Sequence, residues 1–176
     1  MDGVNTLDFV MFDPIEAREE WAVDFGSTHK VVEILIDGRS MKEHIQEIER
    51  PFIKEDPSIE DDTEQYGHVS PKSLYDDLME AADPLYDSGL GVYLFCCASC
   101  GEQGCWSVTC KVKEDEQYVY WYDFQHEHRD WNYHLSFRFD KDAYEQAMRK
   151  LKLMSQKQML YERFRGTEKR WNYLNP

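Results

Sequence analysis

The feature that most constrains the fold is a series of alternating apolar and polar residues in the second half of the chain. Side chains that alternate with a period of two line one buried and one wet face of a β-strand. We therefore predict strands over residues 92–97, 106–113, 118–124 and 132–139. Because 118–124 has bulky residues on both faces, it is predicted to be a central strand covered on both sides. Short connections between the segments favour antiparallel neighbours.

A helical period replaces the alternation after Asp140, which we expect to cap a helix over about 141–164. The apolar stripe of this helix is predicted to contain Tyr144, Ala147, Met148, Leu151, Met154 and Leu160.

The first half of the chain contains a strand-turn-helix unit. The β-branched run 31–36 predicts a strand, and the pair Asp37-Gly38 predicts a turn. Ser40 is expected to cap a helix whose end is followed by Pro51.

Further segments complete the predicted outline. We expect a strand at 7–11, a helix start at 13–16, an acidic surface loop over 52–69, and a short helix after Ser70-Pro71 with Leu74, Leu78 and Met79 facing inward. The order of these elements predicts a single α+β domain over 1–176, with one antiparallel meander sheet and helices packed on it. A long C-terminal helix and a tail at 165–176 end the chain.

Charge is distributed unevenly along the sequence. The net charge is −15 at pH 7, with −20 in residues 1–140 and +5 in residues 141–176. An acidic body repels the nucleic-acid backbone, so we expect no nucleic-acid partner. A basic protein partner is expected instead, because complementary charge speeds capture. The basic C-terminal helix is expected to pack on an acidic body, either its own or that of a second copy in a homodimer.

The composition predicts a folded protein of the cytoplasm. Aromatic residues make up 14% of the chain, which is more than disordered chains carry. We expect no membrane span, because the sequence has no run of 18 apolar residues. The acidic start of the chain lacks the apolar region of a secretory signal, so thiols are expected to stay reduced.

Four of the five cysteines lie close together in the segment from Cys96 to Cys105. Cys97 and Cys100 have the two-residue gap of a zinc knuckle, and Cys105 offers a third thiolate. Gly101 and Gly104 are expected to supply the positive φ that such a turn requires. The fourth ligand is expected to be His126 or His128, with Cys96 as a weaker choice. Inert core thiols, a zinc site and redox chemistry remain alternatives.

The segment from Asp123 to His134 is dense in polar and aromatic side chains. An imidazole there can act as acid, base or ligand, and Arg129 can hold an anion. We regard the following as candidate binding residues: Trp121, Asp123, His128, Arg129, Trp131 and Tyr133. The alternative is a connection between strands with solvated charges and aromatic anchors.

Several motifs resemble, in order, a family of uncharacterised bacterial proteins. They are the CGxxGCW turn at 100–106, the segment 119–124, the HR–W–Y segment from His128 to Tyr133, and the closing FDxxxY helix at 139–144. Residues 34–48 are similar to the N-terminal part of that family. The resemblance covers about 29–50 and 91–150. It implies a bacterial source and no particular activity.

Three functions follow from these observations. The first is a non-catalytic acidic interaction protein, of the immunity type, that binds a basic partner. The second is a small-molecule-binding domain that uses Trp121, Arg129, Trp131 and Tyr133. The third is a metal-binding protein or metal-dependent enzyme that uses the cysteines of 97–105 with His126 or His128. The sequence shows no P-loop, dinucleotide fingerprint, HExxH motif or order of nucleophile, base and orienting group, which favours a non-enzymatic function.

Overall fold

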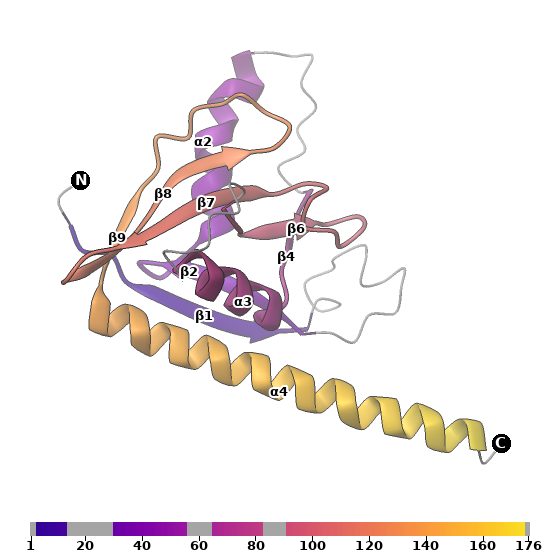
Figure 1. Ribbon diagram of the computed structural model, residues 1–176. Coiled ribbons are helices and arrows are strands. Elements are labelled where there is room, and N and C mark those ends of the chain that lie inside the picture. Colours follow the sequence, from indigo (N-terminus) through magenta and orange to yellow (C-terminus); the bar gives the residue numbers. More distant parts are fainter. Residues whose placement is uncertain (1–2, 14–29, 56–64, 83–90, 175–176) are drawn as a thin grey trace.

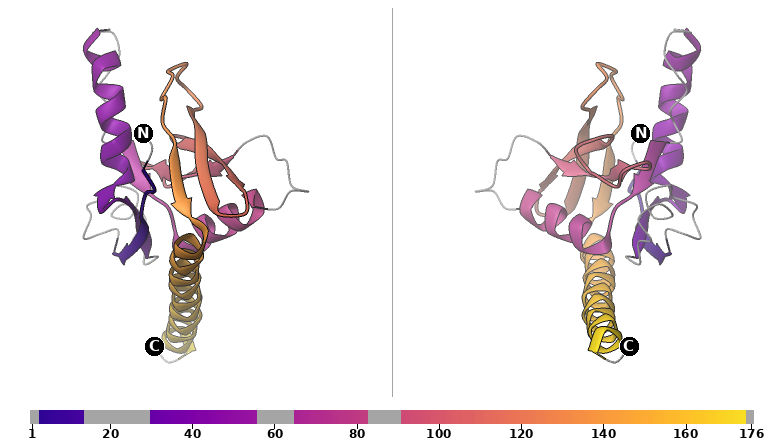
Figure 2. Two further views of the ribbon diagram at one scale, coloured as in Figure 1. Left: turned by 90° about the vertical axis from the view of Figure 1, so that its left-hand side faces the viewer. Right: turned by 90° about the vertical axis from the view of Figure 1, so that its right-hand side faces the viewer.

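The computed structural model describes residues 3–13, 30–55, 65–82 and 91–174, and side chains in the last helix through residue 160 and at residue 163 (Figure 1). The predicted helix start at 13–16 lies largely outside these residues. The α+β class and the long C-terminal helix are confirmed, but the strands form three antiparallel sheets instead of a single meander. Figure 2 shows α2 (Met41–Glu55) and α3 (Pro71–Ala81) on opposite sides of two strands, β8 (Tyr118–His126) and β9 (Phe137–Asp140).

The first sheet has the order β1-β2-β3 and comprises Leu7–Phe12, Val31–Ile36 and Arg39–Ser40. β1 and β2 pair along their full length, from Leu7 opposite Ile36 to Phe12 opposite Val31. The turn between β2 and β3 has positive φ at Asp37 (54°) and Gly38 (76°). This left-handed pair matches the twist of a tight hairpin, so the predicted turn is confirmed.

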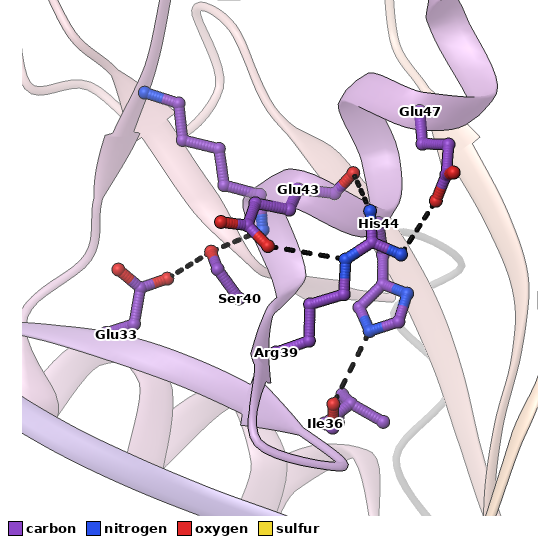
Figure 3. Close-up of polar contacts among 8 residues, drawn as sticks. Glu33, Ile36, Arg39, Ser40, Glu43, His44 and Glu47 are labelled. Atoms are coloured by element: carbon purple, nitrogen blue, oxygen red, sulfur yellow. Dashed lines mark hydrogen bonds and ion pairs between the residues drawn. The ribbon is translucent and has the colours of Figure 1, made fainter.

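Helix α2 (Met41–Glu55) begins directly after this hairpin. Ser40 Oγ accepts a hydrogen bond from the Lys42 N–H at 3.1 Å and donates one to Glu33 at 2.5 Å (Figure 3). The predicted end before Pro51 is wrong, because the helix continues through this proline. A proline removes one backbone hydrogen bond, and the stacking of Phe52 on Trp131 at 5.0 Å holds the last turn.

The predicted loop over 52–69 is helical at its start and a strand near its end. Residues 52–55 belong to α2, and β4 (Tyr66–His68) pairs with β6 (Phe95–Cys97) in a two-stranded sheet. Helix α3 (Pro71–Ala81) follows, with Ser70 Oγ accepting from the Ser73 N–H at 3.0 Å. Leu74 and Leu78 are buried as predicted, whereas Met79 is 49% exposed.

The third sheet has the order β5-β7-β8-β9, comprising Val92–Tyr93, Val108–Glu114, Tyr118–His126 and Phe137–Asp140. The predicted strand over 92–97 is divided, since β5 pairs with β7 whereas β6 pairs with β4. The predicted strand over 132–139 is regular only from Phe137. His134 has a positive φ of 42°, and its N–H bonds to the Asn132 side chain, which interrupts strand geometry.

A bulge in β8 changes which side chains face the core. The register shifts between Thr109 and Lys111 of β7, and Asp123 opposite them has a φ of 54°. Val119 and Trp121 point inward before the bulge, and Phe124 and His126 point inward after it. A regular alternation along 118–124 would place Phe124 on the face of Tyr118, Tyr120 and Tyr122, but the bulge inverts it.

Helix α4 (Lys141–Leu174) packs on α3 and β1 and extends past the body of the molecule (Figures 1 and 2). Asp140 Oδ1 accepts from the Ala143 N–H at 3.0 Å, as expected for a cap. Leu151 is fully buried, but Leu160 is 53% exposed and does not belong to the buried stripe. The predicted tail at 165–176 is helical as far as Leu174. Within the part of the chain that the structure describes, no helix has both the length and the apolarity needed to cross a membrane.

Candidate metal centre

The cysteine turn follows β6 and folds back on itself. The Gly101 N–H donates to the Cys97 carbonyl at 2.8 Å, and the Cys97 N–H donates to the Glu102 carbonyl at 3.0 Å. Gly101 has a φ of 80°, a conformation that side chains other than glycine disfavour. Gly104 does not have a positive φ, so that part of the prediction is wrong, and one glycine is sufficient to reverse the chain.

The turn brings three sulfur atoms together. The Sγ atoms of Cys97, Cys100 and Cys105 all lie within 4.8 Å of one another. Zinc with Zn–S bonds of about 2.3 Å in a tetrahedron requires sulfurs about 3.8 Å apart, so they need to approach by about 1 Å at most. Cys97 is buried, whereas Cys100 and Cys105 are exposed, which leaves the cluster open to solvent on one side.

The thiols of Cys97 and Cys105 differ in how readily they ionise. Burial opposes ionisation of Cys97, but the backbone N–H groups of Cys100 and Ser99 outweigh it and lower the pKa of this thiol. Hydrogen bonds with Cys100 and Cys97 raise the pKa of Cys105 to about 11. A negative charge therefore forms more readily on Cys97 than on Cys105, and a bound divalent cation would favour ionisation of Cys105.

The other two cysteines do not join the cluster. Cys96 is 3% exposed and bonds to the His68 carbonyl at 3.2 Å. It lies on the opposite face of β6 from Cys97, because neighbouring residues of a strand alternate. Cys110 is buried in the core, and burial raises the pKa of its thiol far above the usual value. Both thiols are buried away from the sulfur group, which goes against the weaker suggestion of Cys96 as a ligand.

The predicted histidines lie beside the turn but outside the sulfur group. His126 is 4% exposed, and its Nδ1 accepts from the His128 N–H at 3.0 Å. Burial lowers the pKa of His126 to about 4, so the ring is neutral. His128 is exposed, and its Nε2 lies 2.9 Å from the Cys105 carbonyl oxygen. The expected meeting of the imidazole-rich segment and the cysteine turn is thus present in the structure.

A stack of flat groups connects the turn to α2, and we call it the aromatic ladder. From the turn outward its members are His128, Trp106, Arg129, Trp131 and Phe52. The Arg129 guanidinium lies 5.0 Å from the Trp106 ring centroid and 4.1 Å from that of Trp131. A cation between two indole faces is held by cation–π attraction on both sides. The ladder fixes the segment 126–131 against the turn.

Glu49 lies beneath the ladder and was not identified from the sequence. Its carboxylate is fully buried and accepts from Tyr66 Oη at 2.5 Å and from Tyr133 Oη at 2.7 Å. Arg129 Nη1 lies 3.9 Å away. Burial and the neighbouring carboxylate raise the pKa of both tyrosines, so they remain hydrogen-bond donors. The spacing along the helix could have predicted that Glu49 is buried, because it follows the buried residues Met41 and Ile45 at intervals of four.

The remaining candidate binding residues are divided between a pocket and the core. A pocket of ≈ 570 Å³ is lined by Asp123, Arg129 and Trp131 among others. Trp121 is fully buried and donates to the Tyr144 hydroxyl, so it does not reach this pocket. Tyr133 is also buried, against Glu49. The six predicted residues therefore do not form a single binding surface.

Comparisons with known proteins give no family or relative for this chain. No family model matches it, and neither a curated protein nor a solved structure matches it. The geometry of the described residues is thus the basis for any statement about function.

Proposed function

We propose that this is a zinc-binding protein in which Cys97, Cys100 and Cys105 hold one Zn²⁺ ion. The observation that carries the proposal is the group of three sulfurs within 4.8 Å of one another. Thiolates in this number and at this spacing suit zinc, because it prefers sulfur and nitrogen ligands in a tetrahedron. The role best supported is structural, since the turn lies between β6 and the aromatic ladder and the ion would tie them together.

Cobalt provides a direct test, because Co²⁺ occupies tetrahedral zinc sites and its thiolate charge-transfer absorption reports each bound sulfur. We expect the reduced full-length chain to bind one equivalent of Co²⁺ with strong thiolate absorption, and zinc to displace it. Cys100→Ser and Cys105→Ser should each reduce this absorption by about one third, because each removes one of the three thiolates that a sulfur-rich site would hold.

Cys96→Ser is the matched control. It lies next to the site in sequence but bonds to the His68 carbonyl on the other face of the strand, and serine keeps a donor for that bond. This variant should bind cobalt like the unchanged protein. Equal spectra for Cys96→Ser and Cys105→Ser would refute the three-cysteine site.

The other two functions suggested by the sequence remain predictions. A small-molecule site is supported by the pocket that Asp123, Arg129 and Trp131 line. The other three predicted binding residues do not line this pocket. The net charge of −15 supports a basic partner without indicating a surface for it.

A further inference from the structure

Three thiolates leave one position of a tetrahedral ion unfilled. A fourth sulfur does not come from the described cysteines, because Cys96 faces away from the site and Cys110 lies in the core. Among the described residues, no carboxylate has an oxygen within 4.8 Å of all three sulfurs. If the fourth ligand belongs to the described part of the chain, it must therefore be a group that moves to the ion; otherwise solvent fills the position.

We propose that the imidazole of His128 is this fourth ligand, giving a site with three sulfurs and one nitrogen. The inference rests on the proposed zinc function and assigns a residue to it. His128 Nε2 lies 2.9 Å from the carbonyl oxygen of Cys105, which is itself one of the three thiol residues. The imidazole ring therefore lies beside the backbone of a residue whose sulfur belongs to the group.

The surroundings of His128 allow its ring to turn. It is exposed, and its contacts are the hydrogen bond to Cys105, ring contacts with His126, and a stack on Trp106 at 5.6 Å. Rotation about the side-chain bonds of His128 would move its Nε2 from the Cys105 carbonyl oxygen to the metal, while the backbone stays in place. The backbone N–H of His128 donates to His126 Nδ1 at 3.0 Å, and this hydrogen bond holds the backbone about which the ring turns.

His126 does not have this freedom, although the sequence suggested it first. Its ring is buried, its Nδ1 is occupied by the His128 N–H, and Trp106 packs edge-on against it at 4.5 Å. His126 is paired with Val108 at the end of β8, so bringing its ring to the ion would disturb this packed part of the sheet. His126 is therefore a positioning residue that holds the backbone of the ligand.

Zinc X-ray absorption spectroscopy separates the possible fourth ligands. Imidazole bound to zinc gives outer-shell scattering that water or thiolate does not give. With one equivalent of zinc, the full-length chain should show three sulfurs at about 2.3 Å, one nitrogen at about 2.0 Å, and imidazole scattering. His128→Ala should keep the three sulfurs and lose the imidazole signal. Its zinc affinity should fall roughly 10-fold or more, since even outer-shell partners are worth that much.

Two further variants make the result specific. His128→Gln can keep a hydrogen bond to the Cys105 carbonyl, so it should lose the imidazole signal as His128→Ala does. His134→Ala removes another exposed histidine of the same segment and should leave the spectrum unchanged. Imidazole scattering that persists in both His128 variants, or its absence from the unchanged protein with three sulfurs present, would overturn the assignment. Absence of sulfur scattering would overturn the zinc function itself.

Discussion

Among single residues, Glu49 has the least expected place, because a carboxylate is rarely fully buried. It is stabilised by two tyrosine hydroxyls and lies 3.9 Å from the guanidinium of Arg129. A buried charge of this kind is costly unless hydrogen-bond donors and a nearby opposite charge compensate it. Sequence patterning missed it because an amphipathic stripe is recognised by apolar residues, and a single acid within it resembles the edge of the stripe.

Removing the Glu49 carboxylate should therefore destabilise the fold strongly. Glu49→Ala removes the acceptor of two buried tyrosine hydroxyls and the carboxylate that lies 3.9 Å from the Arg129 guanidinium. We expect a loss of about 3–5 kcal/mol in the free energy of unfolding, measured by urea denaturation.

Glu43→Ala on the same helix is the control for this change. Glu43 is exposed and pairs with Arg39 at 3.3 Å (Figure 3). Surface pairs contribute about 1 kcal/mol at most, so its loss should be small. A cost for Glu49→Ala as small as that for Glu43→Ala would show that the buried cluster does not stabilise the fold.

At the scale of elements, the sequence predicted most of the helices and strands, but it did not predict how the strands pair in three sheets. The hairpin 31–40 and the helix after Ser70 have local signals, because turn and cap residues act over four residues. The division of 92–97 between two sheets and the bulge at Asp123 depend on partners distant in the chain. The three clustered cysteines lie close together in the sequence, so their spacing predicted the sulfur group. The aromatic ladder could not be predicted in this way, because Phe52 and Trp131 lie far apart in the chain.

Gly91 marks the point where the chain enters β5, and its backbone tolerates no side chain. It has a φ of 74°, and a Cβ there would lie 2.7 Å from the carbonyl oxygen of Cys110. Gly91→Ala should cost about 2 kcal/mol or more, from left-handed strain and from the clash. Gly104→Ala, where a Cβ meets nothing within 4 Å, should change thermal stability little. Equal melting temperatures for the two variants would contradict this account.

Glu33 connects β2, β4 and the start of α2, and this connection depends on pH. Partial burial alone would raise the pKa of Glu33, but hydrogen bonds from His68 and Ser40 outweigh it and lower the pKa. A carboxylate with a lowered folded pKa contributes stability above its unfolded pKa, and this is lost as the pH falls through the folded value.

Glu33→Gln should therefore reduce stability at neutral pH and flatten its decline in acid. Glu116→Gln, an exposed change in the β7–β8 turn, should leave the pH profile of unfolding as it is. Parallel profiles for Glu33→Gln and the unchanged protein below pH 5 would exclude Glu33 as a source of the acid dependence.

At the scale of the whole molecule, the proposed zinc site joins parts of the chain that lie far apart in the sequence. The cysteine turn follows β6, while His128 and Arg129 follow β8, and the aromatic ladder continues to the end of α2. An ion held by the turn and by His128 would fasten the first two regions at one point, and the aromatic ladder connects them to α2. Because a metal that binds only the folded state stabilises it, zinc should also raise the melting temperature.

Native mass spectrometry of the reduced full-length protein tests the zinc proposal most directly. After zinc loading and removal of excess metal, we expect one zinc ion per chain. The variant in which Cys97, Cys100 and Cys105 are all serine should retain none. A chain that binds no zinc, or a triple variant that binds as much as the unchanged protein, would contradict the account.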